Sequence, residues 1–200
     1  MIYGNAPTLV KNIEVNSHEL MFVQYLPIKM KGSVSVRIPD NLLIFSEIIT
    51  EVLKEVQLDE YVYITAKHFY VNANSLGNRA GWHSDGFGTS DINYIWSDNS
   101  PTEFCVQPFS ISTDCLISMQ EMEEQAQIEH IITYPCNSLL RLDSSVIHRV
   151  NPAPDEGFRT FVKVSISKEK YNLIGNAHNS LFDYNWDMQK RKPHRNHPAV

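Results

Sequence analysis

The chain has 200 residues, a formal net charge of −6, 42% hydrophobic and 20% charged residues, and three cysteines. This length and composition suit one globular domain with its own core, and the acidic balance disfavours non-specific binding to nucleic acid or to an anionic membrane. No apolar run approaches the roughly 18 residues of a transmembrane helix, and the N-terminus lacks the basic and apolar regions of a secretory signal. The cysteines have no CxxC spacing, which predicts reduced thiols in a cytoplasmic protein.

The first third of the chain predicts one strand and one helix. Residues 33–38 alternate between polar and apolar side chains, which is typical of a half-buried strand. Residues 40–57 predict a helix that Asp40 or Asn41 can cap. Its apolar side chains recur on one helix face, and they are Leu43, Ile44, Ile48, Val52 and Val56. We expect this helix to support a sheet.

From residue 61 onward, the chain predicts a series of short strands rich in β-branched and aromatic residues. Their ranges are 61–73, 92–96, 103–112, 128–134, 138–150 and 159–167. Turn-forming clusters separate them, and residues 117–127 can be a helix or an acidic loop. Short strands without regularly alternating helices predict a mainly β domain, an antiparallel barrel or jelly roll, over residues 1–180. The basic segment 181–200 is expected to be a mobile tail or a peripheral packing segment.

The stretch AGWHSDGFGTSDINYIW, residues 80–96, places His83 and Asp85 two positions apart. On an extended strand both side chains point to the same face, so they can bind one metal ion together. A metal site needs a further ligand, and six histidines besides His83 and His148 compete for that place. His148 is the best candidate because its strand turns through two prolines and a glycine and returns from Arg159, which should bring Arg159 close to it.

Two imidazoles and one carboxylate on one side of a metal ion leave three positions open. This donor set is the facial triad of non-haem Fe(II) oxygenases, in which a co-substrate and O2 occupy the open positions. A nearby arginine is suited to the far carboxylate of a dicarboxylic 2-oxo acid.

The two segments HSD (83–85) and HRVNPAPDEGFR (148–159) resemble the 2-oxoglutarate- and Fe(II)-dependent oxygenases. The closest likeness is to the branch with the prolyl-hydroxylase-type pattern, H-x-D followed later by H-x-V-x-P-x-x-x-G-x-R. This chain has one residue more between the proline and the glycine. The resemblance covers about residues 60–167.

The resemblance implies a double-stranded β-helix, a distorted jelly roll, in which His83, Asp85 and His148 ligate Fe(II) and Arg159 binds 2-oxoglutarate. In relatives, a tyrosine or asparagine on the strand before H-x-D also contacts the co-substrate. The candidates here are Tyr70, Asn72 and Asn74, and Tyr70 and Asn72 share a face on a regular strand. The implied activity is hydroxylation of an amino acid, a peptidyl residue or a small metabolite by O2, with release of succinate and CO2.

Two alternatives to this activity stay open from the sequence. The chain could be a cupin-type metalloenzyme without 2-oxoglutarate, or a non-catalytic jelly-roll binding module. Arg159 would then have no ligand to bind, and its simplest alternative role is a surface salt bridge with Asp155 or Glu156. The aromatic residues Trp82, Tyr94 and Trp96 fit core packing better than the wall of a substrate pocket.

Overall fold

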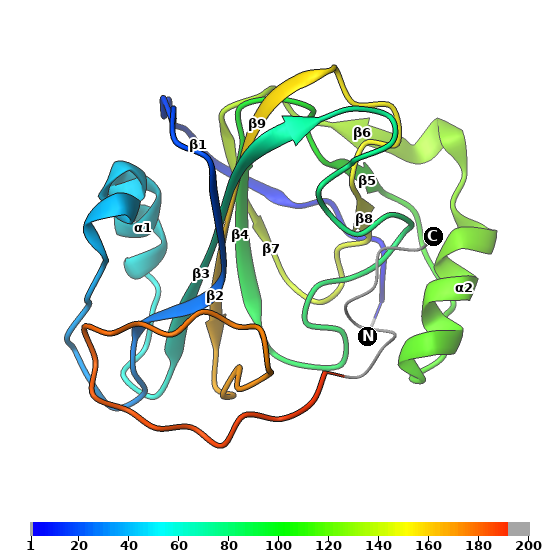
Figure 1. Ribbon diagram of the computed structural model, residues 1–200. Helices are drawn as coiled ribbons and strands as arrows, with labels where there is room; N and C mark the ends of the chain where they lie inside the picture. The colour runs from blue at the N-terminus through cyan, green and yellow to red at the C-terminus, as the bar shows by residue number, and fades with distance from the viewer. Residues whose placement is uncertain (1, 192–200) are drawn as a thin grey trace.

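The computed structural model describes residues 2–191 of the chain, and its fold is mainly β (Figure 1). The large sheet has six strands in the order β1-β7-β4-β9-β3-β2, and the small sheet has three in the order β6-β5-β8. The large sheet consists of β1 (Thr8–Asn12), β7 (Ser138–Leu142), β4 (Ile92–Ser97), β9 (Gly157–Ser167), β3 (Tyr61–Val71) and β2 (Met21–Lys29). The small sheet consists of β6 (Ile131–Thr133), β5 (Glu103–Cys105) and β8 (His148–Arg149). All pairings within these sheets are antiparallel, which confirms the predicted jelly-roll class.

The central strands β3 and β9 have one face toward the helical segment and one toward the small sheet, because successive side chains of a strand point to opposite faces. Their even-numbered apolar residues pack with the helical segment beside the large sheet. Those residues are Val62, Ile64, Ala66, Val162, Val164 and Ile166. The odd-numbered residues therefore face the space between the two sheets, where the candidate site lies.

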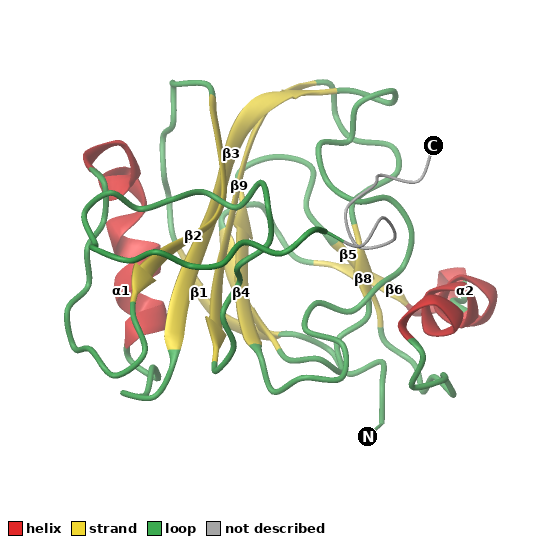
Figure 2. Cartoon of the chain, turned by 60° about the horizontal axis from the view of Figure 1, so that its bottom comes forward, coloured by secondary structure: helices red, strands yellow, loops and turns green. Residues whose placement is uncertain are grey.

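The predicted helix 40–57 begins as a 3-10 turn, η1 (Asp40–Phe45), and continues as α1 (Ser46–Leu53). The capping prediction was wrong, because Pro39 is the N-cap residue and no side chain caps η1. Ile48, Ile49 and Val52 of α1 are buried against the large sheet, so the predicted supporting role is confirmed. In Figures 1 and 2, α1 covers the outer side of the large sheet, away from the small sheet.

Several predicted elements differ from the observed ones. The strand at 33–38 is reduced to an isolated bridge between Lys29 and Val36, because no neighbouring strand pairs with the remaining residues. The undecided segment 117–127 is helical as α2 (Cys115–Gln125), which Asp114 caps by accepting from the N–H groups of Leu116 and Ile117. Segment 128–134 forms η2 (Ile128–His130) before β6, and segment 138–150 divides into β7 and β8.

The chain after β9 runs back over the large sheet without a long helix or strand (Figure 1). The Trp186 ring packs edge-on against the rings of Tyr61 and Tyr63, and Gln189 N–H donates to the Asn172 carbonyl. Residues 181–191 therefore pack at the periphery, whereas 192–200 lie outside the described residues. Across residues 2–191, no helix combines the length and apolar character that a membrane span requires. All three cysteines are free thiols.

Candidate metal centre

His83 and His148 meet across a pair of backbone hydrogen bonds, although 64 residues separate them in the chain. The His83 N–H donates to the His148 carbonyl at 3.0 Å, and the His148 N–H donates to the His83 carbonyl at 2.9 Å. This bridge brings the two imidazole centroids to 4.6 Å from each other. Asp85 follows two residues after His83, and candidate ligand atoms of all three side chains lie within 4.8 Å of one another. Within residues 2–191, the three side chains thus form a group that can hold a metal ion.

The backbone fixes which nitrogen of each imidazole faces this site. His83 Nδ1 lies 2.9 Å from the Gly81 carbonyl, and His148 Nδ1 lies 3.2 Å from the Val146 carbonyl. A carbonyl can only accept, so each Nδ1 carries the proton in these contacts. Both Nε2 atoms are then left with lone pairs for a metal ion, and the carbonyls orient the rings as outer partners commonly do in metal sites.

The protonation states suit metal binding. Burial and the neighbouring His148 lower the pKa of His83 to about 4, so that its imidazole is neutral at pH 7. Burial would raise the pKa of Asp85, but Lys163 and His148 outweigh it and hold the pKa well below the usual range. The group therefore offers a neutral imidazole at His83 and an ionised carboxylate at Asp85, and both forms can ligate a metal ion.

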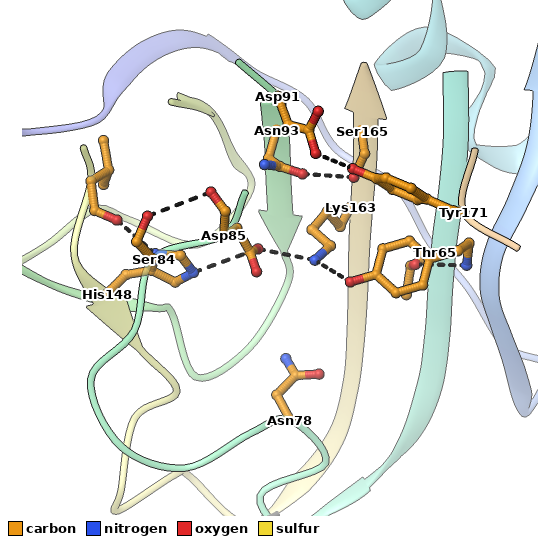
Figure 3. A network of polar contacts seen from close by, with 12 residues as sticks. Thr65, Asn78, Ser84, Asp85, Asp91, Asn93, His148, Lys163, Ser165 and Tyr171 are labelled. Atoms are coloured by element: carbon orange, nitrogen blue, oxygen red, sulfur yellow. Dashed lines mark hydrogen bonds and ion pairs between the residues drawn. The ribbon is translucent and has the colours of Figure 1, made fainter. Parts of the chain in front are cut away.

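Lys163 of β9 extends into the site and contacts the carboxylate directly (Figure 3). Its Nζ lies 3.0 Å from Asp85 Oδ2 and 3.0 Å from the Tyr25 hydroxyl. Tyr25 itself has a positive φ of 49°, and its backbone N–H donates to Thr65 Oγ1 at 3.0 Å. This chain of contacts fixes the position of Asp85 Oδ2, which also lies 3.7 Å from His148 Nε2. Sequence reasoning missed Lys163, although its even spacing from Arg159 places both on one face of the strand.

The turn after Asp85 depends on a glycine. Gly86 has φ +70°, and a Cβ on it would lie 2.9 Å from Asp91 Cβ. Asp91 in turn accepts hydrogen bonds from Ser167 and Tyr171 at 2.6 Å each, and Figure 3 shows the contact with Tyr171. The glycine thus allows the metal-site loop to approach this network closely.

The group opens into a cavity of about 970 Å³. His83, Asp85 and His148 line it, together with inward-facing residues of β3 and β9: Thr65, Lys67, Phe161 and Lys163. The segments 73–80 and 169–173 form further parts of its wall. A cavity of this size can take a small molecule or the side chain of a peptide. Trp82, Tyr94 and Trp96 are buried in hydrophobic clusters and do not line it, in agreement with their predicted packing role.

Arg159 occupies the inner face of β9 and is only 1% exposed. Its Nε donates to the carbonyls of Asn99 and Ser100, whereas Nη1 and Nη2 are buried without any hydrogen-bond partner in the described part of the chain. The guanidinium lies 5.0 Å from the centroid of the Phe161 ring, and Phe161 lines the cavity whereas Arg159 does not. The surface salt bridge considered for Arg159 is wrong, because the side chain is buried and has no such pair. Burial lowers its pKa to about 10.

The structure brings neither Tyr70 nor Asn72 into the cavity. Tyr70 is 47% exposed, and its hydroxyl donates to Glu156 at 3.0 Å on the other face of β3. Asn72 forms a bridge with Ser75 in the turn that follows β3. Of the three candidates, only Asn74 lines the cavity, and the residues of β3 that line it are Thr65 and Lys67. The prediction failed on strand register, because one residue of shift exchanges the two faces.

Comparisons with known proteins identify no family. No family model matches the chain, and no curated protein matches it. Among solved structures, it is similar to the crystal structure of EvdO2 from Micromonospora carbonacea var. aurantiaca, with 14% identity and a TM-score of 0.39. A second structure of EvdO2, complexed with 2-oxoglutarate, gives 14% identity and a TM-score of 0.38. Each match covers 64% of this chain and 60% of the EvdO2 chain, and a likeness this weak carries no function to this protein.

Proposed function

We propose that this protein is an Fe(II)- and 2-oxoglutarate-dependent dioxygenase that hydroxylates an amino acid, a peptidyl residue or a small metabolite. The observation that carries the proposal is the convergence of His83, Asp85 and His148 at one wall of a cavity, with the buried cation of Arg159 on the adjoining strand face. The motifs of the sequence support the same activity.

The donor set fits Fe(II). Two imidazole Nε2 atoms and one carboxylate oxygen would hold the ion on one side and leave room for further ligands on the cavity side. Asp85 Oδ2 lies 3.7 Å from His148 Nε2 and 3.0 Å from Lys163 Nζ, so the carboxylate reaches the ligating nitrogen of His148 while Lys163 holds it in place. The side-chain N–H contacts to Gly81 and Val146 keep both rings in the ligating orientation.

The unpartnered guanidinium of Arg159 fits the co-substrate. A buried cation with two unsatisfied nitrogens is costly unless an anion pairs with it. The far carboxylate of 2-oxoglutarate can accept from both Nη atoms in a bidentate pair. Phe161 lines the cavity, and the guanidinium lies 5.0 Å from the centroid of its ring, so this cation is next to a residue of the cavity wall.

When bound, Fe(II) and 2-oxoglutarate would supply O2 activation coupled to decarboxylation of the co-substrate to succinate and CO2. The protein contributes the orientation of the donors, a cationic anchor for the diacid and a partly enclosed space beside the metal. Without 2-oxoglutarate, as in a cupin-type enzyme or a binding module, the unpaired Arg159 would lack an explanation.

The proposal is tested by adding Fe(II) and 2-oxoglutarate to the apoprotein without oxygen. A visible metal-to-ligand charge-transfer band is expected in the wild type and should be absent in His83→Ala and His148→Ala. Iron binding without any such band, at saturating 2-oxoglutarate, would favour the cupin-type alternative. Absence of metal binding would favour the non-catalytic module.

A further inference from the structure

Lys67 lies in the cavity as a cation without an acidic partner. It is an inward-facing residue of β3, across from Phe161 on β9. Its Nζ donates to the Gly77 carbonyl at 3.0 Å and to Asn78 Oδ1 at 2.9 Å, and both acceptors are neutral. No ion pair within 4 Å joins Lys67 to a carboxylate of the described residues 2–191.

The charges that face Lys67 are mostly positive. Burial lowers its pKa to about 8, with Lys163 and Arg159 acting in the same direction and Asp85 opposing them. The ammonium is therefore still mainly protonated at pH 7, in surroundings that Asp85 alone does not neutralise. A metal ion at the candidate centre would add further positive charge. Partly buried cations of this kind are stabilised by an anion, which here has to come from a ligand.

The hydrogen-bonding capacity that remains around Lys67 fits a carboxylate. An ammonium has three protons, and two of them are used by Gly77 and Asn78, which leaves one N–H. The Asn78 amide accepts through Oδ1, so its Nδ2 group is left to donate. In Figure 3, the Asn78 side chain points toward the pair formed by Asp85 and Lys163. One ammonium proton and one amide N–H match the two oxygens of a monoanion better than they match a phosphate dianion.

We propose that the prime substrate carries a carboxylate and that Lys67 and Asn78 bind it. This inference rests on the proposed function, in which Arg159 takes the far carboxylate of 2-oxoglutarate and leaves Lys67 for the other substrate. Both residues are part of the wall that also contains the metal-binding group, so a carboxylate held there places the rest of the substrate in the same cavity.

The backbone conformation at Gly77 keeps Lys67 and Asn78 next to each other. Gly77 has φ +71°, and a Cβ on it would lie 1.8 Å from the Phe69 ring, so the backbone passes directly over the neighbouring inward-facing residue of β3. This close approach presents the Gly77 carbonyl and the following Asn78 side chain to the ammonium. The 5.1 Å distance between Lys67 Nζ and the Phe22 ring centroid further limits where the ammonium can lie.

Propionate is a suitable probe, and propionamide is its neutral match. With Zn(II) and saturating 2-oxoglutarate present, saturation-transfer NMR should show propionate binding to the wild type and no binding of propionamide. Lys67→Met and Asn78→Asp should each weaken propionate binding by about tenfold or more, which corresponds to about 1.4 kcal/mol. Lys54→Met is the control, because Lys54 is an exposed lysine that follows α1 and does not line the cavity, so this variant should keep wild-type binding.

The inference is overturned if both variants bind propionate as the wild type does. It is also overturned if the wild type binds propionamide as well as propionate, or if it does not bind propionate. The anaerobic Fe(II)–2-oxoglutarate band separates this result from the proposed function. The band should persist in Lys67→Met, and its loss there alone would assign Lys67 to the co-substrate and refute the inference. If the wild type gives no band, the proposed function fails, and the propionate measurement still decides whether the carboxylate site exists.

Discussion

Lys163 and Asp85 form a buried ion pair at the candidate metal centre, with 3.0 Å between Nζ and Oδ2 and side-chain exposures of 10% and 22%. Burial alone would lower the pKa of Lys163, but the Asp85 carboxylate and the Tyr25 hydroxyl outweigh it and raise the pKa. In the metal-free protein, the Lys163 ammonium thus already balances the negative charge of Asp85. A metal ion would share this carboxylate with Lys163 rather than meet it unpaired.

Removing this lysine should destabilise the metal-free protein. In Lys163→Met, the Asp85 carboxylate loses its charge partner, and the free energy of unfolding should fall by about 3 kcal/mol, as for other broken buried pairs. A divalent metal ion should recover part of this loss because it supplies the missing positive charge. Urea titration with and without metal measures both effects. Lys168→Met, which removes the exposed pair with Asp59, is the control and should cost about 1 kcal/mol or less. Equal losses in the two variants would argue against a special role for Lys163.

Replacing Arg159 should separate stability from co-substrate binding. Arg159→Met removes two buried nitrogens that lack partners but also the Nε donor of the Asn99 and Ser100 carbonyls, so the two effects oppose each other and the free energy of unfolding should change by about 2 kcal/mol or less. Affinity for 2-oxoglutarate should nevertheless fall by about 2–5 kcal/mol, because the diacid loses its charged partner. Thermal unfolding and titration of the anaerobic charge-transfer band give the two quantities. A variant that loses stability but binds 2-oxoglutarate normally would show that Arg159 is only structural.

The metal-free protein should become more stable as the pH rises from about 4 to the ordinary histidine pKa near 6.5. The pKa of His83 is lower in the folded protein, so the unfolded state binds more protons across this window, and stability rises with pH there. Above pH 6.5 the contribution of His83 to the free energy of unfolding is fully present. It is lost as the pH falls from 6.5 toward 4. Chemical denaturation of the chelator-treated protein, compared with His83→Gln, isolates this slope. The exposed His130→Gln serves as control, and a His83→Gln profile identical to the wild type would contradict the assignment.

Two glycines with similar backbone angles should respond differently to alanine. Gly77 and Gly32 have φ +71° and +79°, but a Cβ on Gly77 meets the Phe69 ring at 1.8 Å, whereas nothing lies within 4 Å of one on Gly32. Gly32→Ala should cost about 1–2 kcal/mol from the left-handed conformation alone. Gly77→Ala should cost about 1–3 kcal/mol more through overpacking. Equal costs in a denaturation assay would mean that the 72–81 loop is loose over β3.

The sequence was sufficient to predict that His83, Asp85 and His148 lie together, because residue type and spacing carry this signal. His83 and Asp85 share a face through the two-residue period of an extended chain, and His148 was selected by the turn and the arginine that follow it. The bridge between His83 and His148 is the tertiary contact that this reasoning required.

The face of β3 could not be predicted, because both faces of this strand are covered. Its buried run from Tyr61 to Ala66 shows no polar and apolar alternation that would mark the inner side. The choice of Tyr70 and Asn72 therefore rested on the residue types found in the family that the chain resembles and on their shared strand face, and Lys67 was not considered. The strand expected at 33–38 failed for a different reason, since alternation gives a strand only where another strand is available to pair. The assignment to the cytoplasm stays a prediction.

The most direct test is a crystal structure obtained without oxygen in the presence of Fe(II) and 2-oxoglutarate. We expect one metal ion about 2.0–2.2 Å from His83 Nε2, His148 Nε2 and an oxygen of Asp85. We also expect the far carboxylate of 2-oxoglutarate to pair with Nη1 and Nη2 of Arg159. A metal ion held by other residues, or a co-substrate that leaves this guanidinium unpaired, would contradict the proposed function.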